Sequence, residues 1–285
     1  MKKKVFIAIF IVVLTLCMSA CNESDNRVQT NDNKETKAPK VENTNDPNNQ
    51  QKLSISNYID YKITEFTDSK STDKLNYKIK YPQLFGMSDV DKQNELNNTL
   101  KDEALKVLKY YEEPSGFVDI NIDYKIVLET RNILSIQYSG VGDVSNAAHP
   151  NNLFYTTNIN IKSGERLRLK DIVNIDEDLA SKFLNDGFKA LWPAQGEALK
   201  HFTNEEIKQN FTDADSLDYI GTEKQADVFS YFTNDSLGIS ISVSHAIGDH
   251  AEFEIKYQDI KDNAKTENEI WNDLLNPAFE NNYKK

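Results

Sequence analysis

The four histidines are the residues of this chain with the widest chemical range, because imidazole can bind a metal, move a proton or cap a turn. They are His149, His201, His245 and His250. His245 and His250 flank a short loop that also holds Asp249. With His149 they would offer nitrogen and oxygen ligands that suit zinc. Their spacing matches no common zinc motif, and no His-Glu-x-x-His pattern is present. We therefore expect no metal site: His149 would cap a turn, and the other two would lie in a solvated loop.

Sequence motifs of enzymes are absent. The chain contains no Gly-x-Ser-x-Gly elbow, no phosphate-binding loop and no dinucleotide fingerprint. Pairs of acidic residues such as Asp213 and Asp215 are numerous in an acidic chain, so their closeness in sequence carries little information. We therefore expect no catalytic residue, no cofactor and no enzymatic activity, with a metal-assisted cell-wall hydrolase as the alternative.

The two cysteines, Cys17 and Cys21, both lie near the start of the chain, so no disulfide framework is possible in the rest of it. Lys2–Lys4 precede an apolar run, Val5–Leu16, whose length suits a signal peptide better than a transmembrane helix. Residues 18–21, Met-Ser-Ala-Cys, then resemble a bacterial lipobox with Met where Leu is usual. We expect cleavage before Cys21, a lipid such as palmitate on its sulfur, and anchoring at the outer face of the bacterial cytoplasmic membrane. An ordinary secretory signal or a short uncleaved anchor is the alternative.

Composition then divides the chain into parts. Residues 22–52 are rich in Asn and other polar residues and have few apolar ones, so they cannot bury enough surface to fold. The predicted parts are a lipoprotein signal peptide (1–20), the lipidated cysteine with a disordered Asn-rich tether (21–52), a folded domain (53–262, in two portions, 53–145 and 146–262), and a C-terminal helix and tail (263–285).

The net charge restricts the kind of partner. It is -12 for the whole chain, and loss of the three lysines in the first twenty residues leaves -15. Such a chain is a poor nucleic-acid binder, because phosphates require lysine and arginine. The charge suits a cationic partner, or simply a solvated acidic surface.

The most regular β pattern in the chain spans residues 153–161. Its apolar residues alternate with Asn158 and Asn160, which predicts a strand with one buried face. The Ser-Gly pair at 163–164 suits a tight reversal, because glycine tolerates a positive φ. Alternation resumes at 167–169, so we expect a hairpin with a second strand there.

The hairpin is entered through an Ala-Ala-His-Pro corner at 147–150. Pro150 has no N–H and restricts the backbone of His149, so this corner is neither helical nor inside a sheet.

Helical spacing and capping residues predict the remaining elements. An acidic cap near 88–91 opens a long amphipathic helix, and a second helix is expected to run until Trp192-Pro193 stops it. Helices are predicted at about 88–111, 176–191, 203–211 and 267–275, and further strands at 58–67, 74–82 (ended by Pro82), 120–128, 134–138, 228–232, 239–243 and 253–257. This order predicts an α+β fold of mainly antiparallel sheets, with one long and several shorter helices packed on one face.

Taken in order, these pieces resemble the RsiV-type extracellular domain. The resemblance spans about Leu75 to Asp262, and the corner and hairpin carry most of it. The segments concerned are Lys74–Gln83 with the long helix after it, Ala147–Asn151, Asn158–Glu165, Leu167, Leu169, Asp171–Val173, Phe229–Phe232, Leu237–Val243 and Glu252–Ile260. That domain occurs in the anti-sigma factor that senses lysozyme and as the N-terminal module of some polysaccharide deacetylases.

The resemblance implies a non-catalytic binding or sensing module outside the cell. Its expected partner is a cationic protein such as lysozyme or a cell-wall glycan, with the membrane bound through the lipid. We expect no sigma factor as a partner, because only three lysines precede the apolar run, and no deacetylase activity, because little sequence follows the last predicted strand. The expected ligand contacts are His149 and Asn151, at the corner, and Trp192, whose indole could stack on a sugar. A structural envelope protein without a defined ligand is a further alternative.

Overall fold

The computed structural model describes residues 59–112, 115–220, 222 and 224–275. All of them belong to one compact unit, Ser54–Lys285, whose two hydrophobic clusters lie within the described residues. The expected signal peptide, the expected lipidation site Cys21 and the expected tether lie outside these ranges, as does the tail beyond residue 275. Across the described ranges, no helix has both the length and the apolar character needed to cross a membrane.

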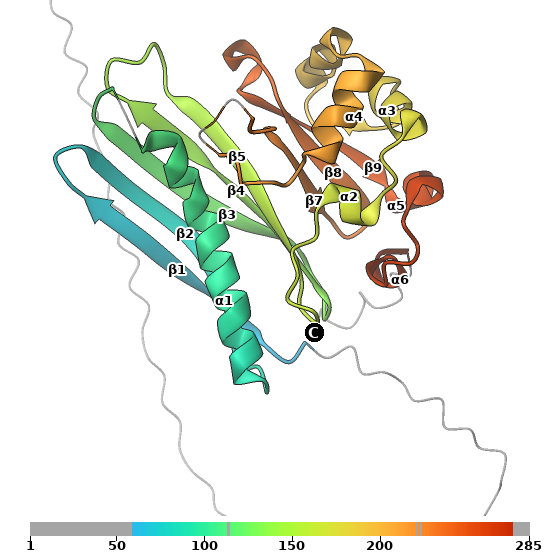
Figure 1. Ribbon diagram of the computed structural model, residues 1–285, viewed down its shortest axis with the longest axis horizontal. Coiled ribbons are helices and arrows are strands. Elements are labelled where there is room, and N and C mark those ends of the chain that lie inside the picture. Colours follow the sequence, from blue (N-terminus) through green and yellow to red (C-terminus); the bar gives the residue numbers. More distant parts are fainter. Residues whose placement is uncertain (1–58, 113–114, 221, 223, 276–285) are drawn as a thin grey trace, which may run out of the picture. The chain divides into compact units, whose positions relative to one another are not determined.

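The described strands form two sheets, and the fold is α+β with mainly antiparallel pairing, as the sequence predicts (Figure 1). The first sheet has the order β1-β2-β3-β4-β5 and takes strands from both sides of the expected division at 145/146. The second has the order β6-β9-β8-β7. The strands are β1 (Lys62–Ser71), β2 (Leu75–Phe85), β3 (Val118–Glu129), β4 (Ile133–Val144), β5 (Asn151–Asn160), β6 (Lys189–Ala190), β7 (Val228–Phe232), β8 (Ser236–Ser242) and β9 (His250–Lys256).

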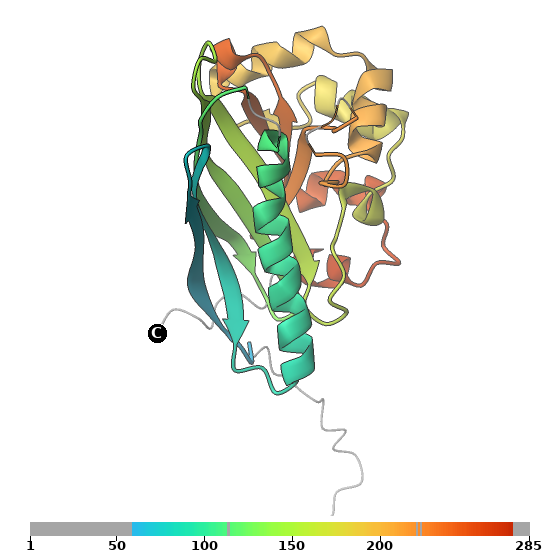
Figure 2. The ribbon, with the colours of Figure 1, turned by 60° about the vertical axis from the view of Figure 1, so that its left-hand side comes forward.

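The predicted long helix is present as α1 (Val90–Leu105), which continues into the 3-10 helix η1 (Lys106–Tyr111). Asp89 caps it by accepting the Lys92 N–H at 2.9 Å. The helix joins β2 to β3, which are parallel, and a parallel pair requires such a crossover. Its apolar stripe packs on one face of the first sheet, along which α1 lies in Figure 2. The opposite face of β3 carries Asp119, Asn121 and Asp123 into solvent.

Strand β5 is buried on both faces, which corrects the expectation of a single buried face. Asn158 and Asn160 are only 3% and 8% exposed. On one side, the Tyr155 hydroxyl donates to the Ala104 carbonyl of α1 at 2.7 Å. On the other, the side chains of Thr156 and Asn158 donate to the Ser230 carbonyl of β7 at 2.6 and 2.8 Å. Thr156 and Asn158 tolerate this burial because each is hydrogen-bonded, and β5 thereby joins the two sheets.

The returning strand predicted at 167–169 is wrong. After the turn, in which Gly164 has φ +81° as expected, the pairing is a single bridge between Ile159 and Arg166. The chain then enters a short helix, α2 (Leu169–Ile172). The Leu169 N–H donates to the Asp215 carboxylate at 2.7 Å and not to a neighbouring strand. A residue 46 positions away therefore prevents the second strand of the hairpin from forming.

Pro82 does not end β2, which continues to Phe85. On one side, Pro82 lies opposite Glu65 of β1. On the other side, β3 pairs only with Leu75–Ile79. No described strand therefore lies beside Pro82 on that side, and the N–H that proline lacks is not needed for pairing. Proline is tolerated in a strand at such an open edge.

The helix predicted at 176–191 is shorter than expected. Asp176 caps α3 (Glu177–Leu184), but Asp186 has φ +66° and the Gly187 N–H returns to the Lys182 carbonyl. This left-handed exit ends the helix. The residues that follow form β6 and a 3-10 helix, η2 (Pro193–His201), which Pro193 begins rather than prevents.

Shorter helices pack against the second sheet and form its core. The predicted capping box is present: Thr203 accepts the Glu206 N–H at 3.3 Å at the start of its helix. Phe183 meets Phe253 of β9 edge-on, with ring centroids 5.1 Å apart. The remaining elements are α4 (Asn204–Thr212), η3 (His245–Ile247), α5 (Tyr257–Ile260), η4 (Lys261–Asn263) and α6 (Ile270–Leu275).

Candidate functional site

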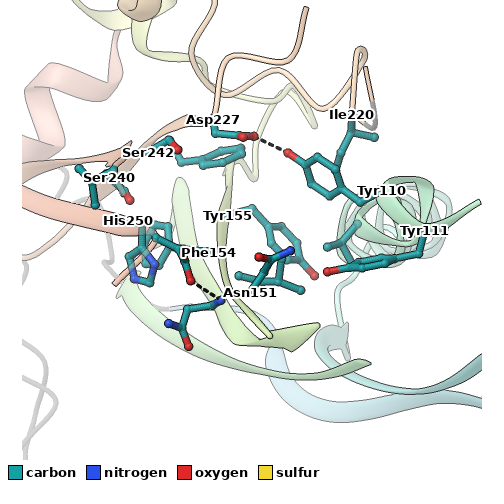
Figure 3. Close-up of a pocket in the computed structure, with 16 residues that line it drawn as sticks. Tyr110, Tyr111, Asn151, Phe154, Tyr155, Ile220, Asp227, Ser240, Ser242 and His250 are labelled. Carbon is teal, nitrogen blue, oxygen red and sulfur yellow. Dashed lines mark hydrogen bonds between the residues drawn. The ribbon is translucent and has the colours of Figure 1, made fainter. Parts of the chain in front are cut away.

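A pocket of about 310 Å³ lies where η1, the start of β5 and the second sheet meet (Figure 3). The three walls come from parts of the chain that are far apart in sequence, and β5 holds them together through its contacts to α1 and β7. Its walls include Tyr110, Tyr111, Asn151, Phe154, Tyr155, Asp227, Ser240, Ser242, Asp249 and His250.

Aromatic rings make up much of the wall. Tyr110 and Tyr111 end η1 and meet edge to face, with centroids 6.5 Å apart and planes at 72°. Tyr155 stacks on Tyr138 at 4.8 Å, which fixes its ring. Phe154 points to the other side of β5, where its ring lies 4.9 Å from that of His250. Rings held in this way lose little conformational freedom when a ligand binds.

Asp227 provides a half-buried carboxyl at the edge of the pocket nearest η1. The Tyr110 hydroxyl donates to its Oδ1 atom. Burial raises the pKa of the Asp227 carboxyl, although the hydrogen bond from Tyr110 opposes the shift. Neither a lysine nor an arginine of the described residues contributes to the pKa shift of Asp227.

The corner at 147–150 lies against the loop between β8 and β9. The Asp249 carboxylate accepts the Asn152 N–H at 2.8 Å and faces His245 Nδ1 at 3.0 Å. His149 stacks on His245 with ring centroids 3.5 Å apart and planes at 10°. Burial raises the pKa of Asp249, but the Asn152 N–H and His245 outweigh it and hold the pKa below its usual range. These contacts fix the two loops to one another beside the pocket.

His250 lies in the wall that the second sheet provides. Its Nδ1 atom is buried and has no hydrogen-bond partner in the described part of the chain. Its Nε2 atom lies 3.6 Å from Glu252 Oε1. A neighbouring carboxylate favours the proton on Nε2, which leaves Nδ1 as an unused acceptor.

Of the three residues predicted as ligand contacts, only one lines the pocket. Asn151 lines the pocket together with Tyr111. His149 lies beside the pocket, against His245, and is not one of its lining residues. Trp192 is 66% exposed at the start of η2 and does not line the pocket either. Within the described ranges, no group of three His, Cys, Asp or Glu side chains is arranged to hold a metal ion.

Tyr110 and Asp227 were not singled out by the sequence. Tyr110 lies in the helix predicted at about 88–111, and no motif or spacing in the sequence marks it. Asp227 comes directly before a predicted strand, 117 positions further along the chain. Only the fold brings the two side chains together.

The fold and the pocket define an α+β domain with a candidate ligand site between its two sheets. No protein-family model matches the sequence, and no curated protein matches it. The solved structures that are similar to part of it include two crystal structures. A DUF3298 family member from Bacteroides fragilis has a TM-score of 0.47 and 14% identity, and the match covers 75% of this chain and 97% of that one. A DUF3298 family protein from Pseudomonas aeruginosa has a TM-score of 0.41 and 11% identity, with 72% and 93% covered.

Proposed function

We propose that this chain is an exported lipoprotein, anchored through a lipid on Cys21, that displays a non-catalytic binding domain outside the cell. The lipobox-like sequence supports the anchor, and the pocket at the start of β5 supports the binding role. The ligand proposed is a cationic protein such as lysozyme or a fragment of the cell wall, as expected from the resemblance to the RsiV-type extracellular domain.

The observation that carries the binding role is the composition of the pocket. Binding sites for small ligands combine apolar and aromatic walls with a few convergent polar groups. Here several aromatic rings surround Asp227, Asn151 and the unpartnered Nδ1 atom of His250. The polar groups of the corner are already used to fix the loops, which favours a preformed site over a reacting one.

The anchor is tested by two cysteine substitutions. Cys21→Ser is expected to abolish incorporation of labelled palmitate and to release the protein from the membrane fraction, because the sulfur that carries the lipid is lost. Cys17→Ser is the matched control. It is expected to keep both the palmitate label and the membrane association, since Cys17 leaves with the signal peptide. Equal labelling of the two variants would refute the anchor.

The binding role is tested by calorimetric titration of Ser54–Lys285 with lysozyme and with muropeptides. Asn151→Ala is expected to weaken binding about 5- to 10-fold, because one pocket hydrogen bond is worth about 1 kcal/mol. Trp192→Ala is expected to leave the affinity unchanged. Loss of binding in Trp192→Ala alone would place the ligand on the exposed indole instead. Absence of binding to either ligand at about 100 μM would reject both ligands.

A further inference from the structure

The walls of the pocket are acidic. Among the described residues that line it, two are acidic, Asp227 and Asp249, and none is lysine or arginine. An anionic group placed there would face carboxyl groups without a positive partner. Coulomb repulsion in a partly dry site therefore disfavours carboxylate and phosphate ligands.

The two carboxyls differ in how they are already used. Asp249 accepts the Asn152 N–H and faces His245 Nδ1, so both of its oxygens already have a partner. Asp227 accepts only the Tyr110 hydroxyl from the described residues, and this donor is neutral. A carboxylate half removed from water gains most from a cation that enters the same space.

The aromatic walls provide a second attraction for positive charge. The Tyr110 and Tyr111 rings meet at a corner of the pocket, and the Phe154 ring stands across it, as Figure 3 shows. The face of an aromatic ring carries partial negative charge and attracts ammonium groups, most strongly where water is excluded.

The free polar atoms of the walls are suited to a ligand that donates hydrogen bonds. His250 Nδ1 is a buried acceptor without a partner in the described ranges, and the second oxygen of Asp227 accepts none there. An ammonium group has three donors and no acceptor. A neutral sugar hydroxyl could also donate, but it would leave the Asp227 charge uncompensated.

We propose that the pocket binds a primary ammonium group carried on an aliphatic chain, with Asp227 as its counter-ion and the tyrosine rings around it. This inference rests on the proposed function, in that the pocket is the ligand site, and it adds the chemical class of the group that enters. An ammonium of this kind is present on a lysine side chain of a cationic protein, and on the free amine of a diamino acid.

The test is a titration with three probes of one length that differ only in charge. Ser54–Lys285 would be titrated at pH 7.5 and fixed ionic strength with pentylammonium, 1-pentanol and pentanoate, each to about 10 mM, and followed by NMR shifts of the pocket residues. Pentylammonium is expected to bind about tenfold more tightly than pentanol, and pentanoate is expected not to bind.

Two variants test whether the preference for pentylammonium over pentanol arises from Asp227. Asp227→Asn keeps the size of the side chain and removes its charge, so the preference for pentylammonium should fall from tenfold to about threefold or less, the part that the aromatic rings provide. Asp102→Asn, which removes the same charge from the exposed face of α1, should keep the tenfold preference. If Asp227→Asn does not fold, Tyr110→Phe provides the second test: it removes the donor that shares the carboxylate, and should strengthen pentylammonium binding about two- to threefold.

The outcomes separate this inference from the proposed function. Equal binding of pentylammonium and pentanol by the unaltered protein, no binding of either, or an undiminished tenfold preference in Asp227→Asn would each overturn the assignment. If lysozyme or muropeptides still bind and Asn151→Ala still weakens them, the pocket remains the ligand site and only the ammonium group is wrong.

Discussion

Trp271→Ala is expected to lower the free energy of unfolding by about 3–5 kcal/mol. Trp271 is 2% exposed and is held in two ways. Its ring meets Tyr257 edge-on with centroids 5.9 Å apart, and its Nε1 donates to the Ile172 carbonyl at 2.8 Å. The truncation removes a large buried side chain and leaves that carbonyl without its donor. Since Trp271 lies in α6 and Ile172 in α2, the contact fastens the last described helix to the core.

The second tryptophan provides a matched control for this prediction. Trp192 is 66% exposed, so Trp192→Ala should change the unfolding free energy by less than about 0.5 kcal/mol. Urea denaturation of Ser54–Lys285, followed by circular dichroism, measures both. A similar loss in the two variants would contradict the burial of Trp271.

Asp215→Ala is expected to cost about 3–5 kcal/mol of unfolding free energy. Asp215 is buried, and its carboxylate accepts the Ser230 N–H at 2.5 Å, the Ser230 hydroxyl at 2.6 Å and the Leu169 N–H at 2.7 Å. Alanine would leave two buried N–H groups without an acceptor, in a backbone with φ +60°. Because Ser230 also holds β5, the same network joins α2 and both sheets.

Asp213 is the control, two positions earlier in the chain. It is exposed at the end of α4, where it accepts a side-chain hydrogen bond from Gln209. Asp213→Ala should cost no more than about 0.5 kcal/mol in the same denaturation experiment. Comparable losses at 213 and 215 would show that the buried network contributes little.

Asp215 also predicts a pH dependence of stability. Burial raises the pKa of its carboxyl from 3.8 to about 6, despite the hydrogen bonds from Ser230 and Leu169. Between these two values the folded state holds a proton that the unfolded state has lost. The contribution of Asp215 to the free energy of unfolding is therefore full below about pH 4 and falls as pH rises to about 6, by about 3 kcal/mol. Above pH 6 it is constant.

The measurement is the difference between two pH profiles. Asp123, Asp178 and Asp235 have lowered pKa values, so their contributions are lost as pH falls and would mask the effect in a single profile. Asp215→Asn keeps these groups and removes only the Asp215 titration. The difference between wild type and Asp215→Asn should change between pH 4 and 6 and be flat above. A flat difference throughout would contradict the raised pKa.

Elements that depend on neighbouring residues in the chain were predictable. The period-two patterns of β3, β4 and β8 and the caps of α1 and α4 involve residues a few positions apart, and each appears at or near its predicted place. Strand β5 was found for the same reason. Its polar face was assigned to solvent because a pattern does not show what will cover it.

The wrong predictions concern elements whose structure is determined by a distant residue or by one exceptional backbone angle. The strand expected at 167–169 is absent because the Leu169 N–H binds Asp215. The helix expected to reach residue 191 stops because Asp186 adopts a left-handed conformation. Pro82 lies inside β2 because β3 does not extend far enough to pair with it. The length of β3, and not the sequence of β2, therefore decides whether proline is tolerated there.

The sequence by itself determined the α+β class, most of the long elements and the prediction of a lipid anchor at Cys21, because each of these depends on local pattern. Only the tertiary structure decided the candidate site. Asn151 became part of it because β5 carries the residue to the end of η1, while Trp192 remained on the surface. Tyr110 and Asp227, 117 positions apart, form their hydrogen bond because the long helix and the second sheet pack on opposite faces of β5. The spacing of residues along the chain does not indicate such packing.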